Sequence, residues 1–261
     1  MLTARNSMSV AGSSFSSPKH RPRPLLLLAM VLSLVVLPAG SAPAATPAGS
    51  VAALQAQLEE GMREYSEAKL ENVRRTLSAW PPEAYTSGAW LVRGEAEERL
   101  AELALLHDLK EAERLAFAAE GSLKRSIALS DSAQARAALA HVYQILAHTG
   151  RVSAARFGPR IPAEIRRAIA LDPSNFNARL MEVQGYLDAP PVFGGNLAKG
   201  IDLLRGLAQE FPDSDRVLYD LARALAKSGD KKAALSYAEA ALRANPQNPF
   251  AARLVSSLGH P

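Results

Sequence analysis

The chain has 261 residues, of which 30 are lysine or arginine and 26 are aspartate or glutamate, and it contains no cysteine. The lack of cysteine excludes disulfide scaffolds, thiol catalysis, cysteine-ligated zinc and a lipid anchor attached to cysteine. The formal net charge of +4 does not indicate nucleic-acid binding. Four of the basic residues lie in the segment 1–44, and the rest of the chain is neutral.

The N-terminal segment has the pattern of a secretory signal peptide. Residues 1–24 carry basic and no acidic residues, and residues 25–37 are apolar apart from Ser33. This apolar run is shorter than the ~20 residues that a spanning helix needs, and small residues follow it up to Ala44. We therefore predict a signal peptide over 1–44 that is cleaved after Ala44, and a periplasmic or secreted protein with no integral membrane segment. An uncleaved N-terminal anchor is the alternative.

The rest of the chain is predicted to be all-α, because good helix formers dominate it and apolar residues recur at spacings of three and four. A linker over 45–50 leads into five predicted helix pairs and a last helix that caps the stack. The predicted pairs are 51–62 with 64–79, 84–106 with 109–129, 132–148 with 160–171, 174–188 with 197–210, and 214–228 with 231–244, and the cap is 249–258.

The last pairs repeat in sequence. Pro173, Pro212 and Pro246 each follow a helix, with separations of 39 and 34 residues. Counted from Asp215, large apolar residues, a turn glycine and the final proline fall where the tetratricopeptide repeat (TPR) family has them, and so do the small residues Ala222, Ala234 and Ala241. The chain thus resembles that family, whose unit is 34 residues. The resemblance implies a right-handed α-solenoid, with divergent pairs over 51–172 and TPR repeats with a capping helix over 173–261.

A glycine-rich stretch, residues 189–199, is interpreted as a lengthened turn between helices. A shift of 34 residues places Gly195 on Gly229 and Asn196 on Asp230, so glycine is expected to supply a positive φ and Asn196 to cap the next helix. A phosphate-binding loop is disfavoured because no strand precedes it, the glycine–lysine spacing is wrong and no serine or threonine follows Lys199.

The five extra residues of this turn, around 189–194, include the apolar Val192 and Phe193. The favoured interpretation is that Phe193 folds back and covers the edge of its repeat. The alternative is that the loop presents Phe193 to a partner.

No pattern indicates an enzyme, a cofactor or a metal site. His141 and His148 are seven residues apart on one helical face, too far for a shared ion, and hydrolase, metalloprotease and dinucleotide-binding motifs are missing from the sequence. Four glutamates between residues 95 and 102 are interpreted as the solvated face of an amphipathic helix; they are Glu95, Glu97, Glu98 and Glu102.

The resemblance implies that the first helix of each pair lines an inner groove that holds a protein or peptide partner. Carried over by position, Arg216, Tyr219, Arg223 and Lys227 line this groove, with Arg253 of the capping helix nearby. Three cations and a tyrosine suit an acidic peptide. The asparagines that accompany the lysines of the family's carboxylate clamp are missing at these positions, and a solvated basic face is the alternative.

We therefore expect an exported scaffold that binds a protein or peptide through the concave face of its repeats, with Phe193 as a further candidate contact. The alternative is a periplasmic TPR-like accessory of a solute transport system, which would contact a binding protein or enclose a small ligand. An enzyme with an unrecognised site is the third, less favoured hypothesis.

Overall fold

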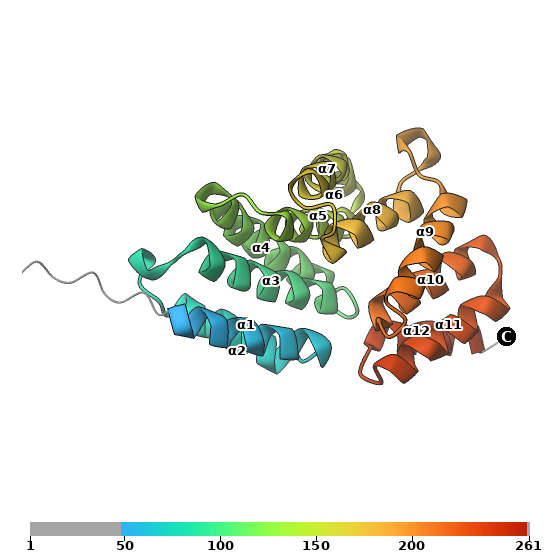
Figure 1. The fold of residues 1–261 in the computed structure, drawn as a ribbon, viewed down its shortest axis with the longest axis horizontal. Helices are drawn as coiled ribbons and strands as arrows, with labels where there is room; N and C mark the ends of the chain where they lie inside the picture. The colour runs from blue at the N-terminus through green and yellow to red at the C-terminus, as the bar shows by residue number, and fades with distance from the viewer. Residues whose placement is uncertain (1–47, 260–261) are drawn as a thin grey trace, which may run out of the picture. The chain divides into compact units, whose positions relative to one another are not determined.

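The computed structural model describes residues 48–259, and the predicted signal peptide over 1–44 lies outside them. The described residues form helices and short 3-10 turns, and no strand occurs among them. Figure 1 follows these helices from α1 and α2 in blue to α11 and α12 in red. The α-helices are α1 (Ala48–Arg63), α2 (Glu67–Ser78), α3 (Ser87–Ala104), α4 (Leu109–Leu129), α5 (Ala133–His148), α6 (Arg151–Phe157), α7 (Ile161–Leu171), α8 (Phe176–Asp188), α9 (Leu197–Glu210), α10 (Asp215–Ser228), α11 (Lys231–Ala244) and α12 (Pro249–Gly259).

All five predicted helix pairs and the last helix are confirmed, with ends that differ from the prediction by at most a few residues. None of the helices that the structure describes has both the length and the apolar character needed to cross a bilayer. The partition into domains stays a prediction.

Helix α6 was not predicted. It lies in the connection between α5 and α7 and ends at Phe157, which is only 1% exposed. The Phe157 ring stacks on that of Tyr143 at a centroid distance of 5.7 Å. A helix of 7 residues with one buried aromatic residue is too short to show a helical period.

Most of the helices begin at a capping residue whose side-chain oxygen accepts a hydrogen bond from a backbone N–H in the first turn. This explains why the helix starts could be predicted within a few residues. The capping residues are Ser66, Thr86, Asp108, Ser132, Asn175, Asn196, Ser214 and Asp230.

The apolar core is divided along the chain. One cluster of buried side chains is formed by α1 to α5 with Phe157, and a second by α8 to α11. In the second half the alanines of the repeat pattern, Ala222, Ala234 and Ala241, are fully buried. Their small side chains let the backbones of neighbouring helices approach closely, as the repeat pattern predicts.

Candidate functional site

Polar side chains from the first helices of four successive pairs form one hydrogen-bonded system, which we call the inner polar network. Gln134 on α5 donates a hydrogen bond to Glu95 on α3. Asn177 on α8 donates to Gln134 at 3.4 Å. Arg216 on α10 donates in turn to the Asn177 side-chain oxygen at 3.3 Å. Side chains on the face that the repeat pattern assigns to a partner are therefore hydrogen-bonded to one another.

The prediction that the four glutamates of α3 form a solvated face is wrong. Glu95, Glu97 and Glu98 are at most 4% exposed, because α3 packs against α1, α2, α4 and α5. Glu97 faces α4, where it accepts a hydrogen bond from Ser122 at 2.6 Å.

The charges of Glu98 and Glu102 are balanced by His141 and Arg99. The Nδ1 atom of His141 contacts Glu98, and its Nε2 atom lies 3.7 Å from Glu102. Burial opposes a charged imidazole, but the two carboxylates outweigh it and raise the pKa of His141. Arg99, which is 2% exposed, forms an ion pair with Glu102.

Glu98, Glu102 and His141 are also the group within the described residues whose ligand atoms lie close enough together to hold a metal ion, within 4.8 Å of one another. Both nitrogens of His141 face carboxylates, and Arg99 pairs with one of them. The arrangement fits a protonated His141 held between the two carboxylates. His141 and Arg99 are the cations that balance these acids, and both are side chains of the protein.

The cavity beside this group is small. It has a volume of about 20 Å³ and is lined by residues of α3, α5, α8 and α10, with Met62 of α1. A cavity of this size accommodates about one water molecule. The inner polar network therefore leaves no room for a peptide side chain between the helices in this conformation.

The predicted basic stripe of α10 is engaged within the fold. Arg223 donates to Asp188 at 2.7 Å and lies 3.4 Å from the buried Asp220. Burial acts against the arginine charge, but the two aspartates raise the pKa of Arg223. Lys227 donates to the backbone oxygen of Leu187 but is itself exposed. Charge reversal at Arg223 would therefore act on the fold as well as on a partner.

Tyr219 and Arg253, the remaining predicted contact residues on the last helices, also make contacts within the fold. The Tyr219 ring packs on Phe250 at 5.9 Å, and burial raises the pKa of Tyr219 to about 12. Arg253 donates to the backbone oxygen of Leu106 at 2.7 Å. Arg253 therefore connects α12 to the turn between α3 and α4, and neither contact involves Phe193.

Tyr65, in the turn between α1 and α2, contacts both α10 and α12. Its hydroxyl donates to Asp215 at 2.8 Å, and its ring packs edge-on against Phe250 at 6.2 Å. The Tyr65 backbone has a φ of 50°, a conformation that is costly for a residue other than glycine. The side-chain contacts hold it there.

We expect Tyr65→Phe to lower the free energy of unfolding by about 1 kcal/mol, because it removes one hydrogen bond and keeps the ring. Asp215 would still accept bonds from Asn245 and Asn248. Urea denaturation followed by circular dichroism measures the change. Tyr237→Phe, on the half-buried side of α11, is the control, and an equal loss in both variants would contradict the role of the Tyr65 hydroxyl.

The lengthened turn after α8 presents apolar side chains to solvent. Val192 is 85% exposed and Phe193 is 79% exposed. The favoured expectation, that Phe193 folds back over the edge of its repeat, is therefore wrong. The reason lies in the backbone, because a 3-10 turn over Pro191–Phe193 directs these side chains away from the helices.

Glycines shape this turn, though not as the alignment of repeats suggested. The alignment placed Gly195 on Gly229, which has a φ of 94°. In this turn, however, the positive φ belongs to the preceding residue, Gly194, at 92°. Gly195 is required for space, because a Cβ atom there would lie 1.7 Å from the backbone oxygen of Ala189. Asn196 caps α9 by accepting from the backbone of Lys199 at 3.0 Å, as predicted.

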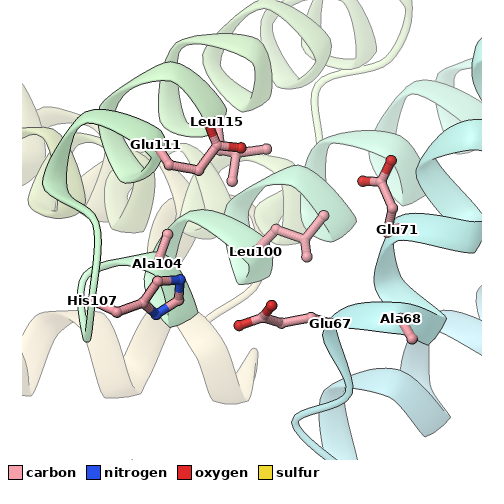
Figure 2. A pocket seen from close by; sticks show the side chains of 8 residues that line it. All are labelled: Glu67, Ala68, Glu71, Leu100, Ala104, His107, Glu111 and Leu115. Carbon is pink, nitrogen blue, oxygen red and sulfur yellow. The ribbon is translucent and has the colours of Figure 1, made fainter.

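A second surface feature, which we call the acidic cleft, lies between α2, α3 and α4 and has a volume of about 350 Å³. Figure 2 shows the carboxylate of Glu67 pointing toward the side of the cleft that carries His107. The sequence did not indicate this site, because each glutamate resembles an ordinary surface residue until three helices bring them together. The lining residues are Glu67, Ala68, Glu71, Leu100, Ala104, His107, Glu111 and Leu115.

Comparison with known proteins identifies the repeats. Residues 194–258 match the family model described as tetratricopeptide repeat. A thermophilic TPR protein of Thermus thermophilus has a similar structure, with a TM-score of 0.54 and 16% identity over 78% of this chain and 98% of that chain. YrrB, described as a TPR protein with an unusual peptide-binding site, gives a TM-score of 0.39 and 13% identity over 78% of this chain and 97% of that one. No curated protein matches the sequence. The likeness to the thermophilic protein establishes the fold, an all-α solenoid of helix pairs.

Proposed function

Because the chain is a tetratricopeptide repeat protein, we propose that it is an exported scaffold that binds a protein partner through the turn 189–194. The observation that carries the proposal is the exposure of Val192 and Phe193 at 85% and 79%. Two neighbouring large apolar side chains in water favour a partner that covers them. Export is supported by the signal pattern of residues 1–44.

The turn is built as a fixed projection. Phe193 and Gly195 both donate backbone hydrogen bonds to the Pro190 oxygen, at 2.9 and 3.1 Å, and Asn196 donates to the Tyr186 oxygen at 2.8 Å. Pro190 and Pro191 restrict the backbone further. A partner that binds here loses little conformational freedom of the loop, which favours affinity.

Lysines surround the same end of the repeats. Lys227 contacts the last turn of α8, directly before the loop, and Lys199 follows the loop on α9. Lys231 and Lys232 are exposed at the start of α11. We propose that the partner offers an apolar pocket for Phe193 with acidic residues beside it. Of the basic stripe of α10, Lys227 contacts the partner, whereas the interior pairs of Arg223 position the helices.

The transport-accessory alternative is less favoured. It requires an enclosed apolar space for a ligand, or a pore, whereas the inner cavity has a volume of only about 20 Å³ and charged side chains in its lining. An exposed apolar loop tip is instead typical of a surface that associates with another protein.

The proposal is tested by site-specific photo-crosslinking in the native envelope. A photoreactive phenylalanine analogue at position 193 is expected to capture a defined partner, which mass spectrometry identifies. The same analogue at position 152 is the matched control, because Val152 is 84% exposed on α6 and does not belong to the loop. Identical capture at both positions, or none at position 193, would contradict the proposal.

We also expect Phe193→Ser to leave the free energy of unfolding unchanged within about 0.5 kcal/mol, since the side chain is exposed. Recovery of the crosslinked partner by pull-down should fall strongly in this variant and stay at the wild-type level in Val152→Ser. Thermal unfolding and pull-down measured on the same samples separate the two effects. A loss of stability in Phe193→Ser would show that the loop is structural.

A further inference from the structure

The acidic cleft has the dimensions and the lining of a binding site at the other end of the chain from the apolar loop. Its volume of about 350 Å³ lies within the range of ligand pockets, ~300–1,000 Å³. Leu100, Ala104 and Leu115 supply an apolar surface, and carboxylates enter from two helices. Glu67 and Glu71 come from α2, and Glu111 comes from α4.

The three carboxylates keep acceptor capacity. Glu71 and Glu111 each accept two hydrogen bonds from an arginine one turn further on, Arg74 and Arg114. These pairs hold the pKa of both carboxyls below the usual range, so both stay ionised. The two arginines do not line the cleft, and a carboxylate can accept about four hydrogen bonds. Glu67 forms no ion pair with any residue of the described range.

We propose that this cleft binds the side chain of an arginine, flanked by apolar residues, in a partner polypeptide. The aliphatic part of an arginine packs on apolar surface while its guanidinium stays with acids, which matches a floor of leucines beside carboxylates. Arginine is favoured over lysine because its planar group pairs with carboxylates through two hydrogen bonds. His107 at the exposed edge adds a further polar contact.

The charge of the chain supports a basic occupant here. Residues 45–150 carry 11 basic and 15 acidic residues, whereas residues 151–261 carry 15 and 11. The half that contains the cleft therefore attracts cations, and the half with the Phe193 loop attracts anions. This inference does not rest on the proposed loop interface, because none of the lining residues belongs to the second half.

The test is an NMR titration of the purified protein with a blocked nonapeptide that has one arginine between leucines. The matched probe has glutamine in place of arginine. Titration to about 5 mM detects millimolar binding. The arginine peptide is expected to shift the amide signals of Leu100, Ala104 and Leu115, and the glutamine peptide to shift them far less.

Carboxylate variants locate the binding. Glu67→Gln combined with Glu111→Gln is expected to raise the dissociation constant about fivefold or more. Glu113→Gln, the same change on α4 outside the cleft, should leave it within about twofold. Glutamine serves as well as glutamate at the third position of a capped helix, so α4 keeps its start after Asp108. Glu67→Gln alone changes an exposed residue and provides the same test if the double variant does not fold.

Any different outcome overturns the inference. Equal shifts with both peptides would show that the cleft selects apolar groups only. Equal binding by the double variant and by Glu113→Gln would place the peptide elsewhere, and no shift of the three cleft residues at about 5 mM would exclude the site. The Phe193→Ser variant is expected to bind the arginine peptide like the wild type, so failure here leaves the loop proposal unaffected.

Discussion

Replacement of Arg99 by methionine is expected to lower the free energy of unfolding by about 3–5 kcal/mol, because it leaves Glu98 and Glu102 with one of their two counter-charges. Arg99 is 2% exposed and pairs with Glu102, and its guanidinium lies 5.8 Å from the centre of the Tyr65 ring. Burial acts against the arginine charge, yet Glu102 and Glu98 raise the pKa of Arg99. Methionine fills a similar volume, so the loss reports on charge rather than on packing.

Arg114→Met is the control for this experiment. Arg114 also pairs with a glutamate three residues away, Glu111, but its side chain is 59% exposed. A pair in contact with water contributes about 0–1 kcal/mol. Urea denaturation of both variants under identical conditions measures the difference. Equal losses in the two variants would show that the Arg99 pair behaves like a surface pair.

The free energy of unfolding is expected to fall by about 2 kcal/mol between pH 5 and pH 8 through Glu95 alone. Burial raises the pKa of Glu95 to about 7 from its ordinary 4.5, and the hydrogen bond from Gln134 only partly offsets this. The proton therefore favours the folded chain. Its contribution is complete below about pH 4.5 and is lost as the pH rises through 7. The raised pKa of His141 acts in the same direction.

Glu95→Gln isolates this contribution. The variant is expected to match the wild type near pH 5 and to exceed its stability by about 2 kcal/mol near pH 8, since glutamine cannot ionise. Glu83→Gln, at an exposed residue between α2 and α3, should follow the wild-type pH profile. Denaturation curves at several pH values give both profiles. A Glu95→Gln profile parallel to that of the wild type would show that Glu95 does not titrate in this range.

The pairing of helices was predictable because it depends on local signals. Capping residues such as Ser214 and Asp230 begin α10 and α11, and the alanines at 222, 234 and 241 mark where those helices touch. These signals act within one repeat, so a single sequence displays them. Helix α6 was not predicted, because one buried aromatic residue in a short helix makes no periodic pattern.

The candidate site was predictable only in part. The sequence identified Phe193 and the basic stripe of α10 as features that need an explanation, but it favoured the wrong orientation for Phe193. Whether a side chain at a turn packs inward depends on the path of the backbone, and here a 3-10 turn and the close approach of Gly195 to Ala189 decide it. The location of the partner site stays a proposal.

By itself, the sequence of this protein determined its helices, their pairing and the turn between α8 and α9, because capping, propensity and spacing act over a few residues. Only the tertiary structure decided the environment of its charges. Glu95 and Glu98 have the pattern of a solvated helix face, yet α3 is enclosed by helices that are adjacent in space. Glu67 and Glu111 lie 44 positions apart and line one cleft. The burial and pairing of a charged group depend on which distant helices surround it, and no local signal encodes that.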